Sequence, residues 1–488
     1  MSSFRSHLDG LREKNDCITI EEHVHWANEA TAVGAEVLHA NGPAVQLTDT
    51  GGIVNLVSGA YGGPDRLAIR EREPWSRITS ALGLSQDSSY QDVITELIAA
   101  TSGEPGNIEW TNTLATAEDV VDLPSLGLPA VHSDGIPTFT LGIAAVPDTP
   151  DIPGRIQSAD MRGEAVSEPA CWAPVRGSVH GGDQLRLSLP REVATSLKPG
   201  SPVTIALGVP PAALIGTLID WRGGARTSDA MAIAAAFADL EVAESVAGPI
   251  PSSSEVLIET TVDTVTTDVI PAGPPTPWEG FIDTVGVSVS ATELALRNDP
   301  TVPFSPTGAP MADGIQLTGT IESAHLFNRL DNYWGVTPVE WIALPAEAGL
   351  GICLIASEIL YAGFEWQLAN TLFSFSSLFD KVIVLESETK PVDLARAFDD
   401  MWVKANPAND WEFSEPNASA ASVPYYRDDG ATGSNLYVDA TWDPRWDTEY
   451  IAPRVTFENM YPEELRRVVE TTWEEMGFDH GPENEPES

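Results

Sequence analysis

The feature that most constrains the fold is a series of short, β-branched apolar runs between about residues 115 and 330, broken repeatedly by Pro and Gly. Runs of this kind are typical of strands in barrels and sandwiches, with Pro and Gly at the turns. The predicted strands are Thr138 to Ile143, Leu185 to Leu189, Val203 to Leu207, Val256 to Val262 and Gly286 to Val289. A single helix is predicted among them, at 228–240. The middle of the chain is therefore predicted to be a β-barrel or sandwich.

The stretch IPAGPPTPW at 270–278 interrupts this β-rich region. Its four prolines lack backbone donors, so it cannot continue a central strand. We predict a loop here, and loops on a rigid scaffold often carry functional residues.

The two flanking regions alternate between helical and strand periods and are predicted to be α/β. Before the β-rich region the predicted elements are helices at 4–13 and 29–39 and strands at 17–20, 44–47 and 54–57. After it they are strands at 352–357 and 381–385 and helices at 366–378 and 392–403. The predicted division is an α/β region at 1–112, a central barrel at 113–330, an α/β domain at 331–460, and a terminal helix with an acidic tail at 461–488.

The clearest single element is the terminal helix, predicted from Pro462 in its first turn to Gly477 as its stop. Its apolar face consists of Leu465, Val468, Val469, Trp473 and Met476. An amphipathic helix needs a surface to cover this face, either on its own chain or on a second subunit. We predict a homo-oligomer that uses this helix in its interface.

The charge balance excludes several classes of partner. The chain has 26 Lys+Arg against 72 Asp+Glu, a net charge of −46, and only five of the basic residues are Lys. Such a surface repels phosphate backbones and anionic lipids, so nucleic-acid binding and membrane insertion are not expected. Dispersed acidic excess with scarce Lys is typical of a protein adapted to a high-salt cytoplasm, where salt screens the self-repulsion.

Cysteine usage and the N-terminal residues point to a reducing, cytoplasmic setting. Cys17, Cys171 and Cys353 are scattered, without a C-x-x-C pair, which argues against a disulfide framework and a zinc site. The start, MSSFRSHLDGLREKND, carries charges where a signal peptide needs an apolar run.

Several segments, in the same order along nearly the whole chain, resemble the UbiD-like decarboxylase family. They are FRSHLDGLREKNDCITIEEHV, VNLVSGAYGGPDRLA, PVTIALGVPPAAL, SEVLIETTV, DKVIVLESETKPVDLARAFDDMW and NLYVDATWDPRW. The resemblance implies a central split barrel of flavin-reductase-like type between two α/β regions. It also implies a reversible, non-oxidative decarboxylation of an aromatic or α,β-unsaturated carboxylic acid, with prenylated FMN and a divalent metal such as Mn²⁺ or Mg²⁺ as cofactors.

The resemblance also implies a set of site residues. In the family, an Asn-x4-Arg segment supplies a metal ligand and a catalytic arginine; here Gln157 replaces the asparagine and Arg162 keeps its place. His180 matches a histidine of the metal and phosphate site, and Asp229 stands where the family has a metal-binding glutamate. Gln157, His180 and Asp229 are thus the predicted metal ligands. Gln157, Arg162 and His180 are the predicted cofactor contacts.

The acid–base carboxylates of the family lie in a Glu-Gly-Pro-Phe-Gly-Asp/Glu loop, which corresponds here to Glu279-Gly280-Phe281-Ile282-Asp283. The loop is one residue shorter and lacks the Pro. Arg162, Glu279 and Asp283 are the predicted catalytic residues: the arginine holds the substrate carboxylate and a carboxylic acid protonates the carbon that loses carbon dioxide. Glu358 replaces a lysine that contacts the flavin phosphate in the family, which reverses the charge there.

Each of these residues also has an ordinary structural interpretation. Arg162 can form a surface ion pair with Asp160 or Glu164, His180 can lie in a solvated loop, Asp229 can cap a helix, and Glu279 can be an exposed loop carboxylate. Two other functions therefore stay open: a catalytically degenerate family member that acts as a structural or partner subunit, and an unrelated acidic binding protein.

Overall fold

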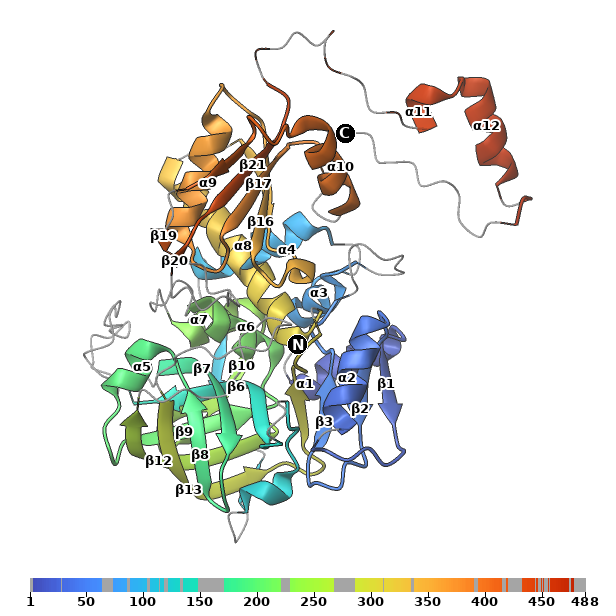
Figure 1. The fold of residues 1–488 in the computed structure, drawn as a ribbon. Helices are drawn as coiled ribbons and strands as arrows, with labels where there is room; N and C mark the ends of the chain where they lie inside the picture. The colour runs from blue at the N-terminus through green and yellow to red at the C-terminus, as the bar shows by residue number, and fades with distance from the viewer. Residues whose placement is uncertain are drawn as a thin grey trace.

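The computed structural model describes the chain apart from residues 1–2, 28, 64–72, 86–87, 103–105, 114, 118–121, 132–134, 148–170, 221–228, 267–285, 310, 335–337, 390–393, 415–417, 420–431, 444, 446–448, 450, 452–454, 456, 474 and 478–488. The described part comprises a small N-terminal sheet, a β-barrel beside it, and a second α/β unit joined to both by a long helix (Figure 1). Within these residues, no helix combines the length and the hydropathy that a membrane span requires.

The N-terminal sheet has the order β1-β2-β3-β14. Its elements are α1 (Phe4–Glu13), β1 (Cys17–Ile20), α2 (Glu29–His39), β2 (Ala44–Leu47), β3 (Asn55–Ser58) and β14 (Thr301–Phe304). The predicted helices and strands of this region are confirmed. The fourth strand comes from residues 301–304, some 240 positions beyond β3, and pairs with it in parallel. The N-terminal region thus completes its sheet with a strand that follows the barrel in sequence.

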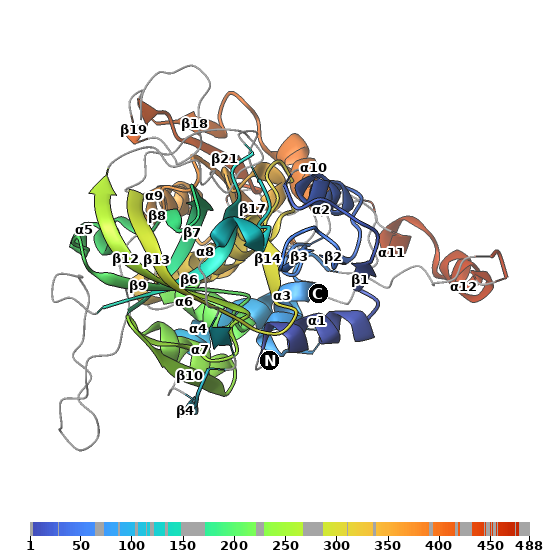
Figure 2. The same cartoon turned by 90° about the horizontal axis from the view of Figure 1, so that it is seen from below.

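The predicted barrel is confirmed, and it is closed by six strands. They are β6 (Thr138–Val146), β7 (Cys171–Val179), β8 (Gln184–Ser188), β9 (Pro202–Leu207), β12 (Val256–Thr266) and β13 (Gly286–Leu296). The order is β12-β9-β6-β7-β8-β13, and pairing between β12 and β13 closes the ring (Figure 2). A short strand, β5 (Thr116–Ala117), pairs with β13. Aliphatic side chains such as Val175, Leu187 and Ile258 fill the core of the barrel.

Sequence reasoning missed one barrel strand, β7. Pro174, Arg176, Gly177 and Ser178 break its apolar alternation, so the segment does not have the pattern of a half-buried strand. The structure builds it nevertheless, because β6 and β8 on either side supply the missing hydrogen-bond partners.

Helices and a three-stranded sheet cover one side of the barrel. They are α5 (Arg191–Ser196), α6 (Pro211–Asp220), α7 (Ala230–Phe237), β4 (Ile108–Trp110), β10 (Leu240–Ser245) and β11 (Gly248–Pro251). The helix predicted at 228–240 is confirmed as α7. It is shorter than predicted because Asp229 caps its start and the chain turns extended at Ala238.

The C-terminal unit is a five-stranded sheet with helices on its faces (Figure 1). Its strands, in spatial order, are β15 (Val339–Ala343), β16 (Ile352–Ser357), β17 (Lys381–Glu386), β21 (Leu436–Ala440) and β18 (Trp411–Phe413). Its helices are α9 (Phe364–Phe375) and α10 (Leu394–Lys404). A short hairpin, β19 (Ala418–Ser419) and β20 (Thr432–Gly433), also belongs to this half. The strands predicted at 352–357 and 381–385 and both helices are confirmed.

The long helix α8 (Asp313–Trp334) links the three parts. It packs against α4 (Tyr90–Ser102), against α6 beside the barrel, and against β15 of the C-terminal sheet. Tyr90 donates a hydrogen bond to the carbonyl of Ile342, which ties α4 to the same sheet. A shorter helix, α3 (Ser76–Leu82), packs against α1 and α6. The N-terminal helices and the C-terminal sheet therefore share one interface.

The last two helices, α11 (Phe457–Met460) and α12 (Glu463–Thr472), stand apart from the rest of the chain in both views (Figures 1 and 2). No residue of α12 is buried. Its apolar side chains Leu465 and Val468 are 53% and 55% exposed, so the face predicted from the sequence is uncovered in the single chain.

Candidate active site

The strand ends that flank the predicted site segments lie at one end of the barrel. Segment 148–170 connects the end of β6 to the start of β7, where Val146 pairs with Cys171. Segment 267–285 connects the end of β12 to the start of β13, where Thr266 pairs with Gly286. Gln157, Arg162, Glu279 and Asp283 themselves lie outside the described residues. Because β6 and β12 are both antiparallel to β9, they run in the same direction, and the ends of β6 and β12 lie at the same end of the barrel as the starts of β7 and β13.

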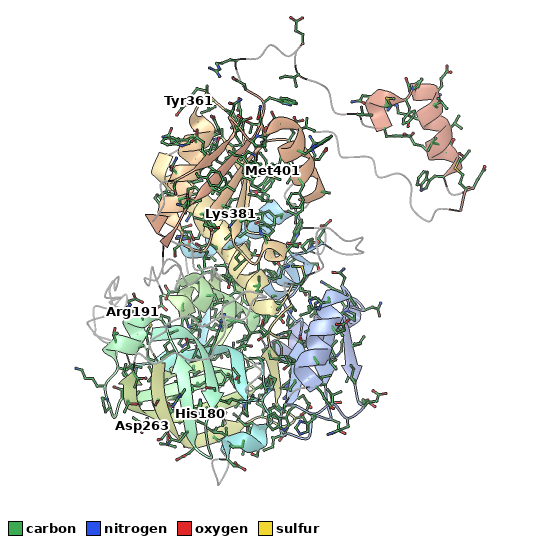
Figure 3. The ribbon with its side chains drawn as sticks, in the orientation of Figure 1. His180, Arg191, Asp263, Tyr361, Lys381 and Met401 are labelled. Atoms are coloured by element: carbon green, nitrogen blue, oxygen red, sulfur yellow. The ribbon has the colours of Figure 1, made fainter. Side chains whose placement is uncertain are left out.

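His180 lies at the other end of the barrel. It follows β7 in the hairpin turn to β8, and its backbone N–H donates to the carbonyl of Gln184. The side chain is exposed, and its Nε2 lies 2.8 Å from Ser178 Oγ. Strand β7 runs from Cys171 to Val179, and these eight residue steps correspond to roughly 26 Å of strand between this turn and Cys171. Figure 3 shows His180 at the lower end of the barrel.

Asp229 lies on a different side of the molecule, at the start of α7. Its Oδ1 accepts a hydrogen bond from the backbone N–H of Met231 at 3.0 Å, so it acts as the N-cap of this helix. Helix α7 packs against α4 and α6, at the upper side of the barrel in Figure 1. The structure therefore does not bring His180 and Asp229 together. In the described part of the chain, no three His, Cys, Asp or Glu side chains are grouped closely enough to hold a metal ion.

The structure adds one residue that sequence reasoning missed, Arg176 of β7. Its guanidinium faces the start of α8: a Cβ placed on Gly314 would lie 3.9 Å from Arg176 Nη2. The register of β6 shifts between Phe139 and Gly142, directly opposite Arg176. Bulges of this kind redirect side chains and are common beside active sites.

Two arginines lie on the side of the barrel that carries Arg176. Arg176 pairs with Ser188 and Ser178 pairs with Arg186 across β7 and β8, so the two arginines project from the same side of these strands. Ser305 connects this surface to α8: its N–H donates to Thr140 Oγ1 at 2.8 Å, and its Oγ accepts from the Gly314 N–H at 3.1 Å. The positive end of the α8 dipole adds to the arginine charge. We call Arg176, Arg186 and Ser305 the arginine face; its chemistry suits a carboxylate or a phosphate.

A buried polar network fixes α8 relative to the N-terminal sheet. Asp313, the first residue of α8, is fully buried, and its carboxylate accepts backbone N–H bonds from Gly59 at 2.8 Å, from Gly62 at 3.0 Å and from Tyr61. Burial raises the pKa of Asp313, and the three N–H donors counteract this shift. The network holds the N-terminus of α8, and with it Ser305 and Gly314, against the barrel.

A neighbouring histidine also belongs to this buried region. His7 of α1 is fully buried, and its Nε2 lies 2.9 Å from the carbonyl of Ala60. Burial lowers the pKa of His7 to about 4, so the ring is neutral at physiological pH. It therefore contributes packing and one hydrogen bond rather than charge.

Glu358 lies in the C-terminal unit, at the end of β16. Glu358 is exposed at the end of β16, and its backbone N–H donates to the carbonyl of Pro338. Tyr361, in the same connection, lies at the end of the C-terminal unit away from the barrel (Figure 3). The carboxylate of Glu358 is therefore remote from the arginine face of its own chain and does not reverse the charge there.

Comparison with known proteins gives consistent matches over nearly the whole chain. Residues 8–97 match the N-terminal domain of 3-octaprenyl-4-hydroxybenzoate carboxy-lyase, and residues 315–440 match its C-terminal domain. The pyrrole-2-carboxylic acid decarboxylase of Pseudomonas aeruginosa is 25% identical over 503 aligned positions, covering 97% of this chain and 98% of the relative.

Solved structures show the same fold. The UbiD-class enzyme HmfF from Pelotomaculum thermopropionicum, in complex with FMN, has a TM-score of 0.74 at 20% identity, covering 94% of this chain and 98% of that one. The vanillic acid decarboxylase of Sedimentibacter hydroxybenzoicus also has a TM-score of 0.74, at 17% identity, covering 98% and 99%. With both domain models matched in order and a relative aligned end to end, the chain belongs to the UbiD-like decarboxylase family.

Proposed function

We propose that this protein catalyses the reversible, non-oxidative decarboxylation of an aromatic or α,β-unsaturated carboxylic acid. The observation that carries the proposal is the end-to-end match to a pyrrole-2-carboxylate decarboxylase, together with an arginine face in the middle of the fold. Arginine on this face is notable because the chain has only 26 basic residues and a net charge of −46. A local concentration of positive charge on such a protein favours an anionic ligand.

We assign the substrate carboxylate to Arg176. Arg176 is half-buried on a central barrel strand, and a rigid strand positions a guanidinium better than a loop does. The family spacing of Asn-x4-Arg also recurs here, as Cys171-x4-Arg176, with Cys171 buried in the barrel core. Arg162, which follows Gln157 with the same spacing, is the alternative residue for this role. We assign to Glu279 the delivery of the proton to the carbon that loses carbon dioxide, with Asp283 as the second carboxylate of the predicted acid–base pair.

The residues present fit the anionic part of a flavin cofactor. Arg176 and Arg186 provide guanidinium charge and N–H donors of the kind that bind phosphate. Prenylated FMN held there would supply an electron sink for the decarboxylation. The protein's own part is to orient the acid on Arg176 and to deliver a proton from Glu279.

A divalent metal fits the described residues less well. His180 and Asp229 lie apart, and one oxygen of Asp229 already caps α7. A metal site is therefore proposed only for Asp229 together with Gln157, and no catalytic step depends on it.

The reaction is tested by deuterium incorporation at the carbon that carries the carboxylate. Protein produced together with a prenyl-flavin synthase is incubated in heavy water with pyrrole-2-carboxylate and other aromatic acids. We expect wild-type protein to bind flavin and to give deuterated product, and Glu279→Gln to lose exchange by about 10² to 10⁴-fold while keeping the flavin spectrum. Wild-type protein that binds no flavin and gives no exchange would support the degenerate partner subunit instead.

We also propose that α12 covers its apolar face on a second copy of the chain. Leu465 and Val468 are exposed and the helix stands away from the body, so its uncovered face favours association. Removing 461–488 is expected to lower the oligomer mass measured by light scattering in molar salt. Leu465→Ser with Val468→Ser should reproduce the loss, whereas Glu470→Gln on the polar side should not. An unchanged mass after truncation would place the interface elsewhere.

The charge composition of the chain favours a particular working environment for the protein. The net charge of −46 and the scarcity of Lys support a salt-rich cytoplasm as the working environment. The six-stranded closed barrel supports the flavin-reductase-like type of split barrel.

A further inference from the structure

The bulge in β6 lies directly beside Arg176 and contains a threonine. The register of β6 against β7 shifts between Phe139 and Gly142. Thr140 and Leu141 of β6 therefore stand opposite one residue of β7, Arg176. A bulge of this kind bends the strand and changes the direction of the side chains next to it. The backbone conformation of β6 at Thr140 thus bears on where Arg176 points.

A hydrogen bond ties this bulge to the segment that leads from β14 into α8. The backbone N–H of Ser305 donates to Thr140 Oγ1 at 2.8 Å, across 165 positions of the chain. Ser305 directly follows β14, so the bond holds the end of that strand against β6. The regular ladder between β6 and β7 is interrupted at the bulge, and this side-chain bond supplies part of the support that regular pairing gives elsewhere.

Ser305 extends the connection to α8 through its own side chain. Its Oγ accepts the Gly314 N–H at 3.1 Å, which satisfies one of the free N–H groups in the first turn of the helix. The preceding residue, Asp313, is fully buried, and its carboxylate accepts N–H bonds from Gly59 and Gly62 at 2.8 and 3.0 Å. The start of α8 is thus fixed on one side to the loop after β3 and on the other side to the β6 bulge.

Arg176 lies between the two ends of this chain of hydrogen bonds. The point at which a Cβ of Gly314 would stand is 3.3 Å from Ser305 Oγ and 3.9 Å from Arg176 Nη2. The absence of a side chain at Gly314 therefore lets the half-buried guanidinium lie close to the backbone of α8. A cation gains nothing from the dipole at this end of a helix, so α8 limits where the guanidinium can lie rather than attracting it.

We propose that Thr140 and Ser305 are positioning residues for Arg176: together they hold the β6 bulge and the start of α8 in the arrangement that keeps the guanidinium in one orientation. This inference rests on the proposed function, in which Arg176 orients the carboxylate of the substrate. A shift of about 1 Å in a group that orients a substrate can cost on the order of 10²-fold in rate. Two hydroxyl groups outside the reacting centre can therefore have a large effect on the reaction.

The first test observes Arg176 without using activity. Full-length protein, with and without bound flavin, is treated with phenylglyoxal, which modifies accessible guanidinium groups, and the rate at each arginine is read from peptide mass spectra. In the wild type, half-buried Arg176 should react more slowly than exposed Arg186. Thr140→Val keeps the shape of the side chain but removes the acceptor, and Ser305→Ala removes the acceptor of the next bond. Each should raise the rate at Arg176 about fivefold and leave the rate at Arg186 unchanged.

Two variants control for general loosening of the barrel. Thr140→Ser keeps the acceptor and should react like the wild type. Thr260→Val removes a hydroxyl at another bulge of the same barrel, on β12, where Thr260 donates to the carbonyl of Val203 at 2.8 Å. It should change the rate at Arg176 less than about twofold, because β9 and β6 separate β12 from β7. Combining Thr140→Val with Ser305→Ala should not exceed the larger single effect, since the two bonds act in series.

Deuterium exchange by the flavin-loaded protein then tests whether this position matters for the reaction. Thr140→Val should lower the maximal rate about tenfold or more while the KM for the acid rises less than about threefold, because a misplaced guanidinium keeps its charge but loses its alignment. Thr140→Ser should restore the rate.

Two results would overturn the positioning role: an unchanged phenylglyoxal rate at Arg176 in both Thr140→Val and Ser305→Ala, or an equal rise in Thr260→Val. A different result would separate this inference from the proposed function. If the phenylglyoxal rate rises as expected but Arg176→Ala leaves the exchange rate unaffected, the positioning role stands and the assignment of the substrate carboxylate to Arg176 is wrong.

Discussion

Replacing Arg176 with Ala is expected to reduce the rate of decarboxylation by about 10³-fold or more, while the protein still folds. A guanidinium that fixes the substrate carboxylate supplies both orientation and charge stabilisation, and losing either typically costs two to three orders of magnitude. Arg176 lies opposite the β6 bulge and faces Gly314 at the start of α8, so no other described arginine can replace it there. The measurement is the initial rate of deuterium exchange with reconstituted flavin.

Two matched variants make this result interpretable. Arg191→Ala removes an exposed arginine from the start of α5, outside the arginine face, and is expected to keep most of the activity. Arg162→Ala tests the arginine first implied by the family motif. Loss of activity in Arg162→Ala with retained activity in Arg176→Ala would show that Arg162, and not Arg176, holds the substrate carboxylate.

Replacing Arg77 with Met is expected to destabilise the N-terminal part of the fold by about 3 to 5 kcal/mol. Arg77 has a fully buried side chain, and its Nε and Nη2 each donate to Asp16 at 2.8 Å. Its Nη1 donates to the carbonyl of Gly59 at 2.7 Å, and Nη2 to that of Gly42 at 2.9 Å. Methionine fills much of the same volume but removes the donors that Arg77 supplies to Asp16, Gly59 and Gly42.

The change is measured as a shift of the urea midpoint at fixed salt, together with hydrogen exchange of the β2 and β3 amides. Arg467→Met is the control: Arg467 pairs with Glu463 at 3.0 Å, but both side chains are exposed, so a change below about 1 kcal/mol is expected. Equal effects from the two substitutions would mean that water replaces the buried contacts of Arg77. Faster exchange confined to β2 and β3 would confirm that the network acts locally.

The sequence by itself determined most of the local structure. Strands such as Cys17–Ile20, Ala44–Leu47 and Ile352–Ser357 follow from apolar, β-branched runs between turn residues, and their bounds agree with the structure. The start of α7 follows from Asp229, because a short carboxylate accepts the free N–H groups at a helix end. The order of the motifs along the chain also indicated the family, because a motif is recognised from its residue types and not from tertiary contacts.

Only the tertiary structure decided which of these residues meet. Residues 301–304 complete the N-terminal sheet beside β3 through a pairing across more than 240 positions, which no local pattern encodes. Arg176 lies in a strand that its own sequence does not favour; β6 and β8 hold it in place and a bulge turns it toward α8. His180 and Asp229, equally plausible as ligands in the sequence, separate because a hairpin turn and a helix cap lie at different ends of the barrel. Spacing along a chain fixes secondary structure through local sterics and hydrogen bonds, whereas a binding site depends on long-range strand pairing and on the burial that follows from it.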